Sequence, residues 1–204
     1  MKVAVLGASG NIGSQIVTEA LSRGGHTITA IARHPEKIMA RLGVTAVKGD
    51  LSDTSALGAV LRGHDAVISS VRFKTFKPDQ LIDAVKQSGV KRLLVVGGAS
   101  TLEVKPGVML LDTPEFPAAA KEEATGGRDH FNVLRQQNDL EWTFLSPSAM
   151  IGPGERTTRF RLGGDQLLVG ADGKSRISYP DYAIAMVDEL EKKAHVRKRF
   201  TVGY

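Results

Sequence analysis

Residues 2–13 read Lys2-Val3-Ala4-Val5-Leu6-Gly7-Ala8-Ser9-Gly10-Asn11-Ile12-Gly13. The apolar run over 2–7 predicts a short strand, and the helical spacing of apolar residues over 11–23 predicts a helix directly after it. A strand, a glycine turn and a helix in this order are typical of the phosphate-binding corner of a dinucleotide-binding fold.

The three glycines of this turn have distinct expected roles. Gly7 permits the tight turn, Gly10 lets the backbone approach a pyrophosphate, and Gly13 lets the helix pack close to the strand. The N–H groups and the positive dipole end of the helix would then face the phosphates. The alternative is a glycine turn that binds nothing. The expected phosphate-binding set is completed by the other turn residues, Ser9, Asn11 and Ile12.

Strands and helices alternate along most of the chain, which favours a parallel sheet covered on both faces. We therefore predict an α/β fold, a Rossmann-like doubly wound parallel sheet in a single domain over 1–204, with about 146–178 contributing a small substrate lobe. The expected strands are 2–7, 26–32, 44–48, 65–71, 91–96, 142–145 and 199–202, and the clearest helices are 11–23, 54–62, 78–88 and 180–192.

Several segments have weaker patterns. A proline in the first turn predicts a short helix over 34–42, and three prolines predict a long loop over 101–117. Residues 118–137 predict a helix, but Thr125-Gly126-Gly127 is a poor helix former that would break or kink it, or act as the hinge of a lid. Short strands are expected near 158–162 and 166–169.

The composition excludes several classes of site. Hydrophobic residues make up 42% of the 204 residues and charged residues 24%, as in an ordinary soluble globule. The absence of cysteine excludes disulfides and thiolate chemistry, and the five histidines lack metal-ligand spacing, so no metal is expected. No apolar run approaches the roughly 18 to 20 residues that span a bilayer. A strand at the very start leaves no room for a signal peptide, so we expect a cytoplasmic protein without a membrane partner.

The net charge is +5 and the isoelectric point about 9.5, a balance also found in proteins that bind nucleic acid. The basic residues are mostly scattered, however, and the one dense run, 195–199, lacks interleaved aromatic residues. We interpret that run as solvated surface and expect no nucleic-acid partner. A modest positive field would instead attract an anionic cofactor.

The end of the second strand bears on the choice of cofactor. NAD-binding folds have an acidic residue there that accepts hydrogen bonds from the ribose, whereas this chain has Arg33. A guanidinium forks well onto phosphate oxygens, and Lys37 can add charge one helical turn later. We therefore predict a preference for NADP(H), with NAD(H) as the other option. The alternative for both side chains is a solvated surface.

Further cofactor contacts are expected at the carboxyl ends of the next strands, where ligands bind in such sheets. Asp50 is placed to meet the adenine edge, with Leu51 against the ring, unless Asp50 merely caps the following helix. The ends of the fourth and sixth strands should border the ribose and nicotinamide, unless their residues only fill loops. These residues are Ser69, Ser70, Val71 and Pro147.

Motifs spread along the chain now indicate a family. The glycine spacing at 7–13 resembles the short-chain dehydrogenase/reductase superfamily in its atypical branch. The further motifs are Gly97-Gly98-Ala99-Ser100, Leu140–Ser148, Pro153–Thr157, Gly173–Ser178, Asp181–Ala183, Asp188–Glu191 and Arg199–Tyr204. With these motifs, essentially the whole chain resembles the group provisionally named NADH-flavin reductases, which is related to NmrA-like proteins and to biliverdin reductase B.

The sequence departs from that superfamily in its proton donor. Typical members have a Tyr-x-x-x-Lys pair, but none of the three tyrosines here has a lysine four residues on, and Lys121 has no tyrosine partner. Interconversion of alcohols and ketones needs a general acid or base at the oxygen. Hydride transfer to a flavin or quinone is less demanding, because the reduced acceptor takes its proton from solvent. The resemblance therefore favours an NADPH-dependent reductase of a flavin, quinone or similar conjugated acceptor.

Few polar residues remain as catalytic candidates. By the resemblance, Ser100 falls at the position of the superfamily's catalytic serine, and Ser148 near a polar residue that borders the nicotinamide. Each is alternatively a structural serine. Four arginines of the second half would line a pocket for an acidic acceptor or simply face solvent: Arg156, Arg159, Arg161 and Arg176.

The resemblance leaves two functions open. One is the reductase. The other, for which NmrA-like proteins are the precedent, is a non-catalytic NADP(H) sensor that reports redox state to a partner protein. The sequence names neither the acceptor nor the oligomeric state, so a monomer and a homodimer are both open.

Overall fold

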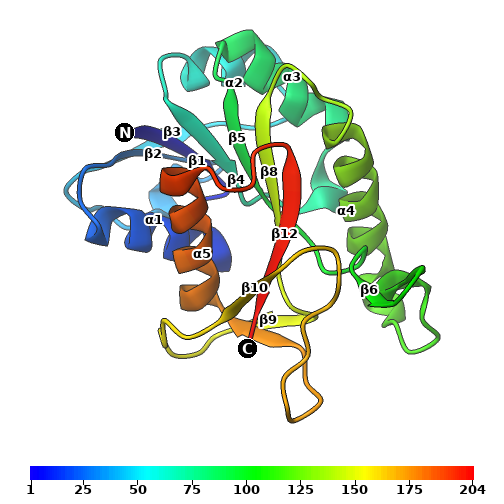
Figure 1. Cartoon of the computed structure of the whole chain (residues 1–204). Helices are drawn as coiled ribbons and strands as arrows, with labels where there is room; N and C mark the ends of the chain where they lie inside the picture. The colour runs from blue at the N-terminus through cyan, green and yellow to red at the C-terminus, as the bar shows by residue number, and fades with distance from the viewer.

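The computed structural model describes the whole chain, Met1–Tyr204. An eight-stranded sheet with the order β10-β12-β8-β5-β4-β1-β2-β3 forms its centre (Figure 1). Every neighbouring pair is parallel except β10 and β12 at one edge. The strand order reverses at β1, as in the Rossmann fold, so the predicted fold class is confirmed. The strands are β1 (Lys2–Leu6), β2 (Thr27–Ala32), β3 (Val44–Lys48), β4 (Ala66–Ser69), β5 (Arg92–Val96), β8 (Glu141–Ser146), β10 (Arg161–Gly163) and β12 (Lys198–Gly203).

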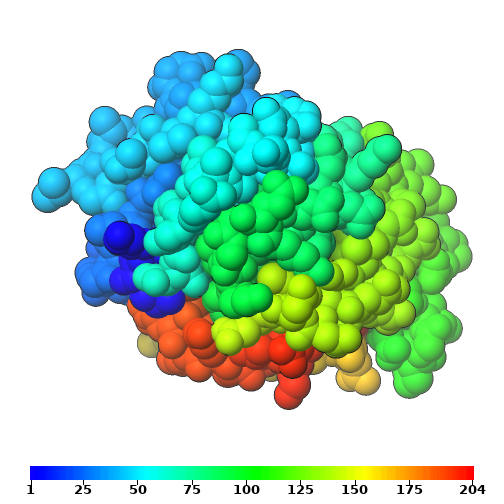
Figure 2. Space-filling view, turned by 90° about the horizontal axis from the view of Figure 1, so that it is seen from above, coloured from blue at the N-terminus to red at the C-terminus, as the bar shows by residue number.

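Helices cover both faces of the sheet. α1 packs against α5 on one face, and α2 and α4 each pack against α3 on the other (Figure 1). Seen from above, the orange-red end of the chain lies directly beside its blue beginning (Figure 2). The helices are α1 (Asn11–Ser22), α2 (Thr54–Leu61), α3 (Pro78–Ser88), α4 (Lys121–Leu134) and α5 (Tyr179–Lys192). No helix is both long and apolar enough to cross a membrane.

The apolar strands explain why both faces need cover. Val3 and Val5 of β1 belong to the core beneath α1 and α5, whereas Ala4 and Leu6 belong to the core beneath the other helices. Alternate residues of a strand face opposite sides of a sheet, so a continuously apolar strand is stable only between two layers.

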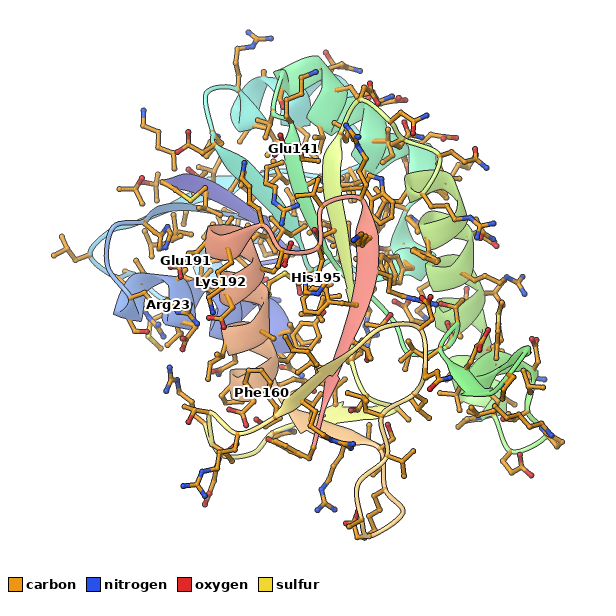
Figure 3. The ribbon with its side chains drawn as sticks, viewed as in Figure 1. Arg23, Glu141, Phe160, Glu191, Lys192 and His195 are labelled. Atoms are coloured by element: carbon orange, nitrogen blue, oxygen red, sulfur yellow. The ribbon has the colours of Figure 1, made fainter.

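Ion pairs fasten the ends of α1 and α5 together. The guanidinium of Arg23 donates to Asp188 at 2.6 Å and to Glu191 at 2.9 Å, while its Nε donates to Glu19 at 3.0 Å. Figure 3 shows Arg23 and Glu191 side by side at this end of the two helices. The first and last helices of the chain therefore behave as one layer.

The predicted helix over 34–42 is wrong. Only a single 3-10 turn forms, η1 (Pro35–Lys37), and an extended segment follows it. Leu42 is fully exposed and Met39 is 69% exposed. Of the apolar side chains in this segment only Ile38 packs against the core, and a single core contact does not stabilise further helical turns.

The predicted break in the alanine-rich helix is also wrong. α4 runs without interruption through Gly126 and Gly127, after a 3-10 turn, η4 (Ala118–Ala120). An added Cβ would lie 3.2 Å from Phe73 Cβ at Gly126 and 3.1 Å from the Phe73 ring at Gly127. Close packing against Phe73 offsets the poor helix propensity of glycine, so the two glycines form a contact surface within a continuous helix.

The irregular segments contain short elements that differ from the expectations. The loop over 101–117 holds a hairpin, β6 (Glu103–Lys105) with β7 (Val108–Met109), followed by η3 (Leu110–Asp112). In the substrate lobe β9 (Met150–Gly152) pairs with β11 (Arg176–Ser178), a pairing the sequence did not predict. Residues 166–169 form no strand, since Gln166 makes only one isolated bridge, to Glu103.

The carboxylate of Asp181 fastens the lobe to the sheet layer. It lies fully buried in the first turn of α5. One oxygen accepts from the Thr157 hydroxyl and, at 2.8 Å, from the Tyr204 hydroxyl, and the other accepts from the Thr158 N–H at 2.9 Å. One side chain thereby joins the lobe, α5 and the end of β12.

The basic run at 195–199 is only partly solvated. His195 stacks on Phe200 with ring centroids 4.0 Å apart and contacts the buried Glu189 at 2.8 Å. Arg199 lies over the Phe131 ring and donates to Thr101 and Asp165. These two basic side chains therefore belong to the internal structure of the chain.

Candidate functional site

A groove of about 200 Å³ opens where β1, β2, β3 and β4 end. This edge is where open α/β sheets bind their ligands. Eight of the residues predicted to contact a cofactor line it: Gly7, Ser9, Gly10, Arg33, Asp50, Leu51, Ser70 and Val71.

Close backbone approach builds the glycine turn at the head of this groove. Gly7 has a φ of +74°, and a Cβ there would lie 2.5 Å from the Ser70 carbonyl oxygen. The Gly10 N–H donates to the Gly7 carbonyl at 3.0 Å, and a Cβ on Gly13 would lie 2.3 Å from that same oxygen. The turn therefore excludes side chains at Gly7 and Gly13, and Gly13 packs α1 against the turn itself.

The N-terminus of α1 has the features of an anion site. Gly10 caps the helix without a side chain, and no acidic residue lies in the first turn. The exposed Asn11 donates towards the Tyr179 hydroxyl at 3.5 Å, and Ile12 packs against the core. Neither of these two side chains lines the groove, and a contact of their backbone N–H groups with a phosphate stays a prediction.

Arg33 supplies positive charge to the groove. It follows β2 directly, is exposed, and lines the groove together with Asp50, the only acid among the lining residues. The Ser52 N–H donates to Asp50 at 2.9 Å. That hydrogen bond, with the charge of Arg33 as a smaller contribution, lowers the pKa of the Asp50 carboxyl below its usual range. Asp50 is therefore ionised at neutral pH.

The capping alternative for Asp50 does not hold. The cap of α2 is Asp53, whose carboxylate accepts from the Ala56 N–H at 2.9 Å. Leu51 is 6% exposed and joins the core while lining the groove. Lys37 lies exposed on η1 and is not among the lining residues.

The predicted residues near the nicotinamide are divided between groove and interior. Ser70 and Val71 line the groove, but Ser69, at 2% exposed, is buried in β4. Pro147 is buried directly after β8. Neither Ser69 nor Pro147 lines the groove.

Both serines predicted as catalytic are buried and hydrogen-bonded to the backbone. Ser100 Oγ donates to the Ala124 carbonyl of α4 at 3.1 Å, and Ser148 Oγ donates to the Val202 carbonyl of β12 at 3.0 Å. Their exposed fractions are 5% and 1%. These contacts support the structural alternative, and a catalytic role stays a prediction that requires each hydroxyl to leave its carbonyl.

Only two of the four arginines of the lobe line a common hollow. Arg156 forms two hydrogen bonds with Glu19 of α1, and Arg161 donates to the carbonyls of Val169 and Tyr204. Arg159 and Arg176 line a second, wide-open hollow beside Ser178 and Tyr204. Arg176 is paired with Asp172 at 2.7 Å.

One wall of the groove was not predicted from the sequence. Arg72, Thr75 and Phe76 line it from the segment between β4 and α3, which contains the 3-10 turn η2 (Phe73–Thr75). Their position after a parallel strand was the available signal. The turn residues lack a periodic pattern, so nothing local in the sequence marked them.

Comparison with known proteins agrees with this geometry. A family model described as NAD(P)H-binding matches residues 7–193. Protein YwnB of Bacillus subtilis, described as uncharacterized, is 39% identical over 210 residues, covering 99% of this chain and 98% of YwnB.

Two solved structures are similar over the whole chain. A protein of Bacteroides thetaiotaomicron, provisionally named an epimerase, is 41% identical with a TM-score of 0.94, covering 100% of this chain and 96% of its own. A protein of Streptococcus pneumoniae, provisionally named an NADH-flavin reductase, is 39% identical with a TM-score of 0.85, covering 100% and 99%. The match of the family model over most of the chain decides the assignment: this protein belongs to the NAD(P)H-binding family.

Proposed function

We propose that this protein is an NADPH-dependent reductase that transfers a hydride to a flavin, a quinone or a similar conjugated acceptor. The bound dinucleotide supplies the hydride. The protein binds and orients both partners. Monomeric and homodimeric forms are both compatible with this proposal.

The residues of the groove suit a phosphorylated dinucleotide. Gly7 and Gly10 line the groove, where backbone without side chains would let a pyrophosphate approach. The first turn of α1 offers N–H groups uncapped by side chains. Arg33, at the end of β2, is the observation that favours NADP(H) over NAD(H). A guanidinium attracts the 2′-phosphate of NADP(H), whereas an acidic side chain would repel it. Asp50 and Leu51 would then border the adenine.

The protein's side chains favour an acceptor that needs no proton from the protein. Ser100 and Ser148 both donate to carbonyls. Tyr182 donates to the Leu145 carbonyl, and its complete burial raises the pKa of its phenol well above the usual range. A flavin or quinone draws its proton from solvent, which supports this acceptor class over a ketone. The similarity to the pneumococcal protein supports the same class.

The cofactor preference is tested by reversing the charge at the groove. Arg33→Glu should weaken NADPH binding by about 1.5–3 kcal/mol, the strength of hydrogen bonds to a charged group, and should change NADH binding far less. Arg62→Glu makes the same change of charge at an exposed position at the end of α2 and should leave both affinities unchanged. Calorimetric affinities for NADPH and NADH measure this, and an Arg33→Glu variant with unaltered preference refutes the assignment.

Turnover decides between the reductase and the NADP(H) sensor. NADPH oxidation is followed with FMN, riboflavin and simple quinones. Saturable turnover with one acceptor class supports the reductase. Tight NADPH binding without turnover across the panel supports the sensor, for which the engaged hydroxyls of Ser100 and Ser148 are the favouring observation.

A further inference from the structure

The wall of the groove formed by Arg72, Thr75 and Phe76 is built on a single turn. This turn, η2, is a 3-10 turn closed by two hydrogen bonds to the Arg72 carbonyl, from the Thr75 N–H at 3.1 Å and from the Thr75 hydroxyl at 2.7 Å. No side chain at the N-cap of η2 satisfies its first N–H groups. The position of this wall therefore depends on contacts with another element.

Glu123 of α4 supplies those contacts. Its Oε1 accepts from the Phe73 N–H at 2.8 Å, and its Oε2 accepts from the Lys74 N–H at 3.2 Å. One carboxylate thus holds two successive backbone donors of η2 from a position about fifty residues later in the chain. Hydrogen bonds to a charged acceptor are stronger than neutral ones.

The same face of α4 also packs against Phe73 of η2 and against Phe76 of the wall. Gly126 and Gly127 leave only enough room for Phe73, as an added Cβ at either position would lie 3.1–3.2 Å from it. The ring of His130, one helical turn later, lies 4.4 Å from the ring of Phe76. Phe76 therefore contacts α4 on one side and lines the groove on another.

We propose that Glu123 is a positioning residue for the adenosine half of the dinucleotide: by holding the N–H groups of Phe73 and Lys74, it sets the groove wall formed by Arg72, Thr75 and Phe76. The inference rests on the proposed binding of NADP(H) in this groove. The adenosine half is specified because Arg33, Asp50 and Leu51, which are proposed to contact the 2′-phosphate and the adenine, line the same groove. Ser70 and Val71 also line it, but Ser69 and Pro147, predicted beside the nicotinamide, do not. Glu123 itself does not line the groove.

The test compares Glu123→Gln with Glu122→Gln. The amide at 123 keeps the size of the side chain, but its NH2 group cannot accept a backbone N–H. Glu122 is the matched control, because it is adjacent on α4, loses the same charge, and contacts only the exposed Lys74 ammonium, at 3.2 Å. Affinities are measured for NADPH, for 2′,5′-ADP as the adenosine half, and for reduced nicotinamide mononucleotide as the other half.

Glu123→Gln should lower the affinities for NADPH and for 2′,5′-ADP by the same factor. We expect about tenfold, which corresponds to one lost hydrogen bond to a charged group. The nicotinamide mononucleotide should bind as it does to the wild type, and Glu122→Gln should match the wild type with all three ligands. Unchanged affinity for 2′,5′-ADP overturns the proposal. An equal loss for both halves also overturns it, because it indicates a general effect on the fold.

Hydrogen–deuterium exchange on the wild-type chain gives a second readout that needs no variant. Saturating 2′,5′-ADP should slow exchange of the amides over 72–76, and the absence of such protection contradicts the proposed wall. A wild type that fails to bind NADPH defeats the proposed function itself. If the wild type binds NADPH tightly and Glu123→Gln binds NADPH and 2′,5′-ADP with unchanged affinity, only this inference is overturned.

Discussion

At the scale of single residues, Gly7 is constrained by the backbone on two counts. Its φ of +74° lies in the left-handed region, and the Ser70 carbonyl occupies the space a side chain would need. The first constraint costs a non-glycine residue roughly 1–2 kcal/mol. Because of the second constraint, a side chain at position 7 would force the end of β4 to move. Ser70 and Val71, which line the groove, would move with it.

Gly7→Ala should therefore destabilise the chain by more than about 2 kcal/mol and should weaken NADPH binding severely. Gly63→Ala separates the two effects, since Gly63 has a φ of +79° with nothing within 4 Å of the added Cβ. Gly63→Ala should lose only the stability that the positive φ costs a non-glycine residue, and it should keep its affinity for NADPH. Urea unfolding and calorimetric titration measure the two quantities, and equal losses in both variants contradict the steric argument.

The site residues that could be predicted from the sequence are those fixed by backbone rules. The spacing of Gly7, Gly10 and Gly13 follows from close approach, and Arg33 follows from the end of a strand. The burial of Ser69, Ser100 and Ser148 depends on contacts with distant segments, such as the Ala124 carbonyl. No local pattern distinguishes a serine that donates to a distant carbonyl from one that faces a ligand.

At the scale of elements, α4 shows how tertiary contacts override local propensity. Gly126 and Gly127 predict a break, yet the helix is continuous because Phe73 packs against them. The parallel strands were predictable, as their continuous apolar runs require burial on both faces. The hairpin β6–β7 and the β9–β11 pair were not, because strands of two or three residues depend on partners that no short pattern reveals.

His130 of α4 makes the stability of this contact depend on pH. Its Nδ1 donates to the Gly126 carbonyl at 2.7 Å, its Nε2 is buried without a partner, and the Phe73 and Phe76 rings lie 4.9 and 4.4 Å away. Burial lowers the pKa of His130 below its ordinary value. The unfolded chain therefore binds more protons as the pH falls below about 6.5, and stability is lost in that range.

His130→Asn should reduce that loss, because asparagine can keep a donor near the Gly126 carbonyl without titrating. The free energy of unfolding should fall between pH 7.5 and 5.5 by up to about 1 kcal/mol more in the wild type than in the variant. Urea denaturation at the two pH values measures the difference. An identical pH dependence in both proteins shows that His130 is not the responsible group.

At the scale of the whole molecule, buried and partly exposed polar groups join parts that are distant in the sequence. Asp181 connects the lobe with the end of β12, and the ion pairs of Arg23 connect the first helix with the last. Arg92 and Glu189 form a further pair, both about 2% exposed, between β5 and α5. Breaking one partner of such a buried pair costs more than an exposed pair contributes.

Asp181→Asn should destabilise the chain by about 2–3 kcal/mol, because an amide offers one acceptor oxygen to three donors. Loss of the tie should also make residues 153–160 more accessible to proteolysis. Asp172→Asn is the control within the same lobe, since Asp172 is 44% exposed in its pair with Arg176 and should change stability by less than about 1 kcal/mol. Thermal unfolding measures the change in stability, and limited proteolysis measures the accessibility of the segment. Equal stability and equal proteolysis of the two variants would contradict the proposed role of Asp181.

The place of β12 in the sheet has a consequence for how the protein is made. Residues 198–203 lie between β8 and β10, inside the sheet rather than at its edge. During synthesis the segments preceding them emerge first and begin to fold, but the sheet has a gap until these residues leave the ribosome. Until then β8 offers an open edge, which is the kind of surface that pairs with other chains. A nascent chain stalled shortly before residue 198 should therefore depend on chaperones, whereas a chain in which these residues have emerged closes this gap in its sheet.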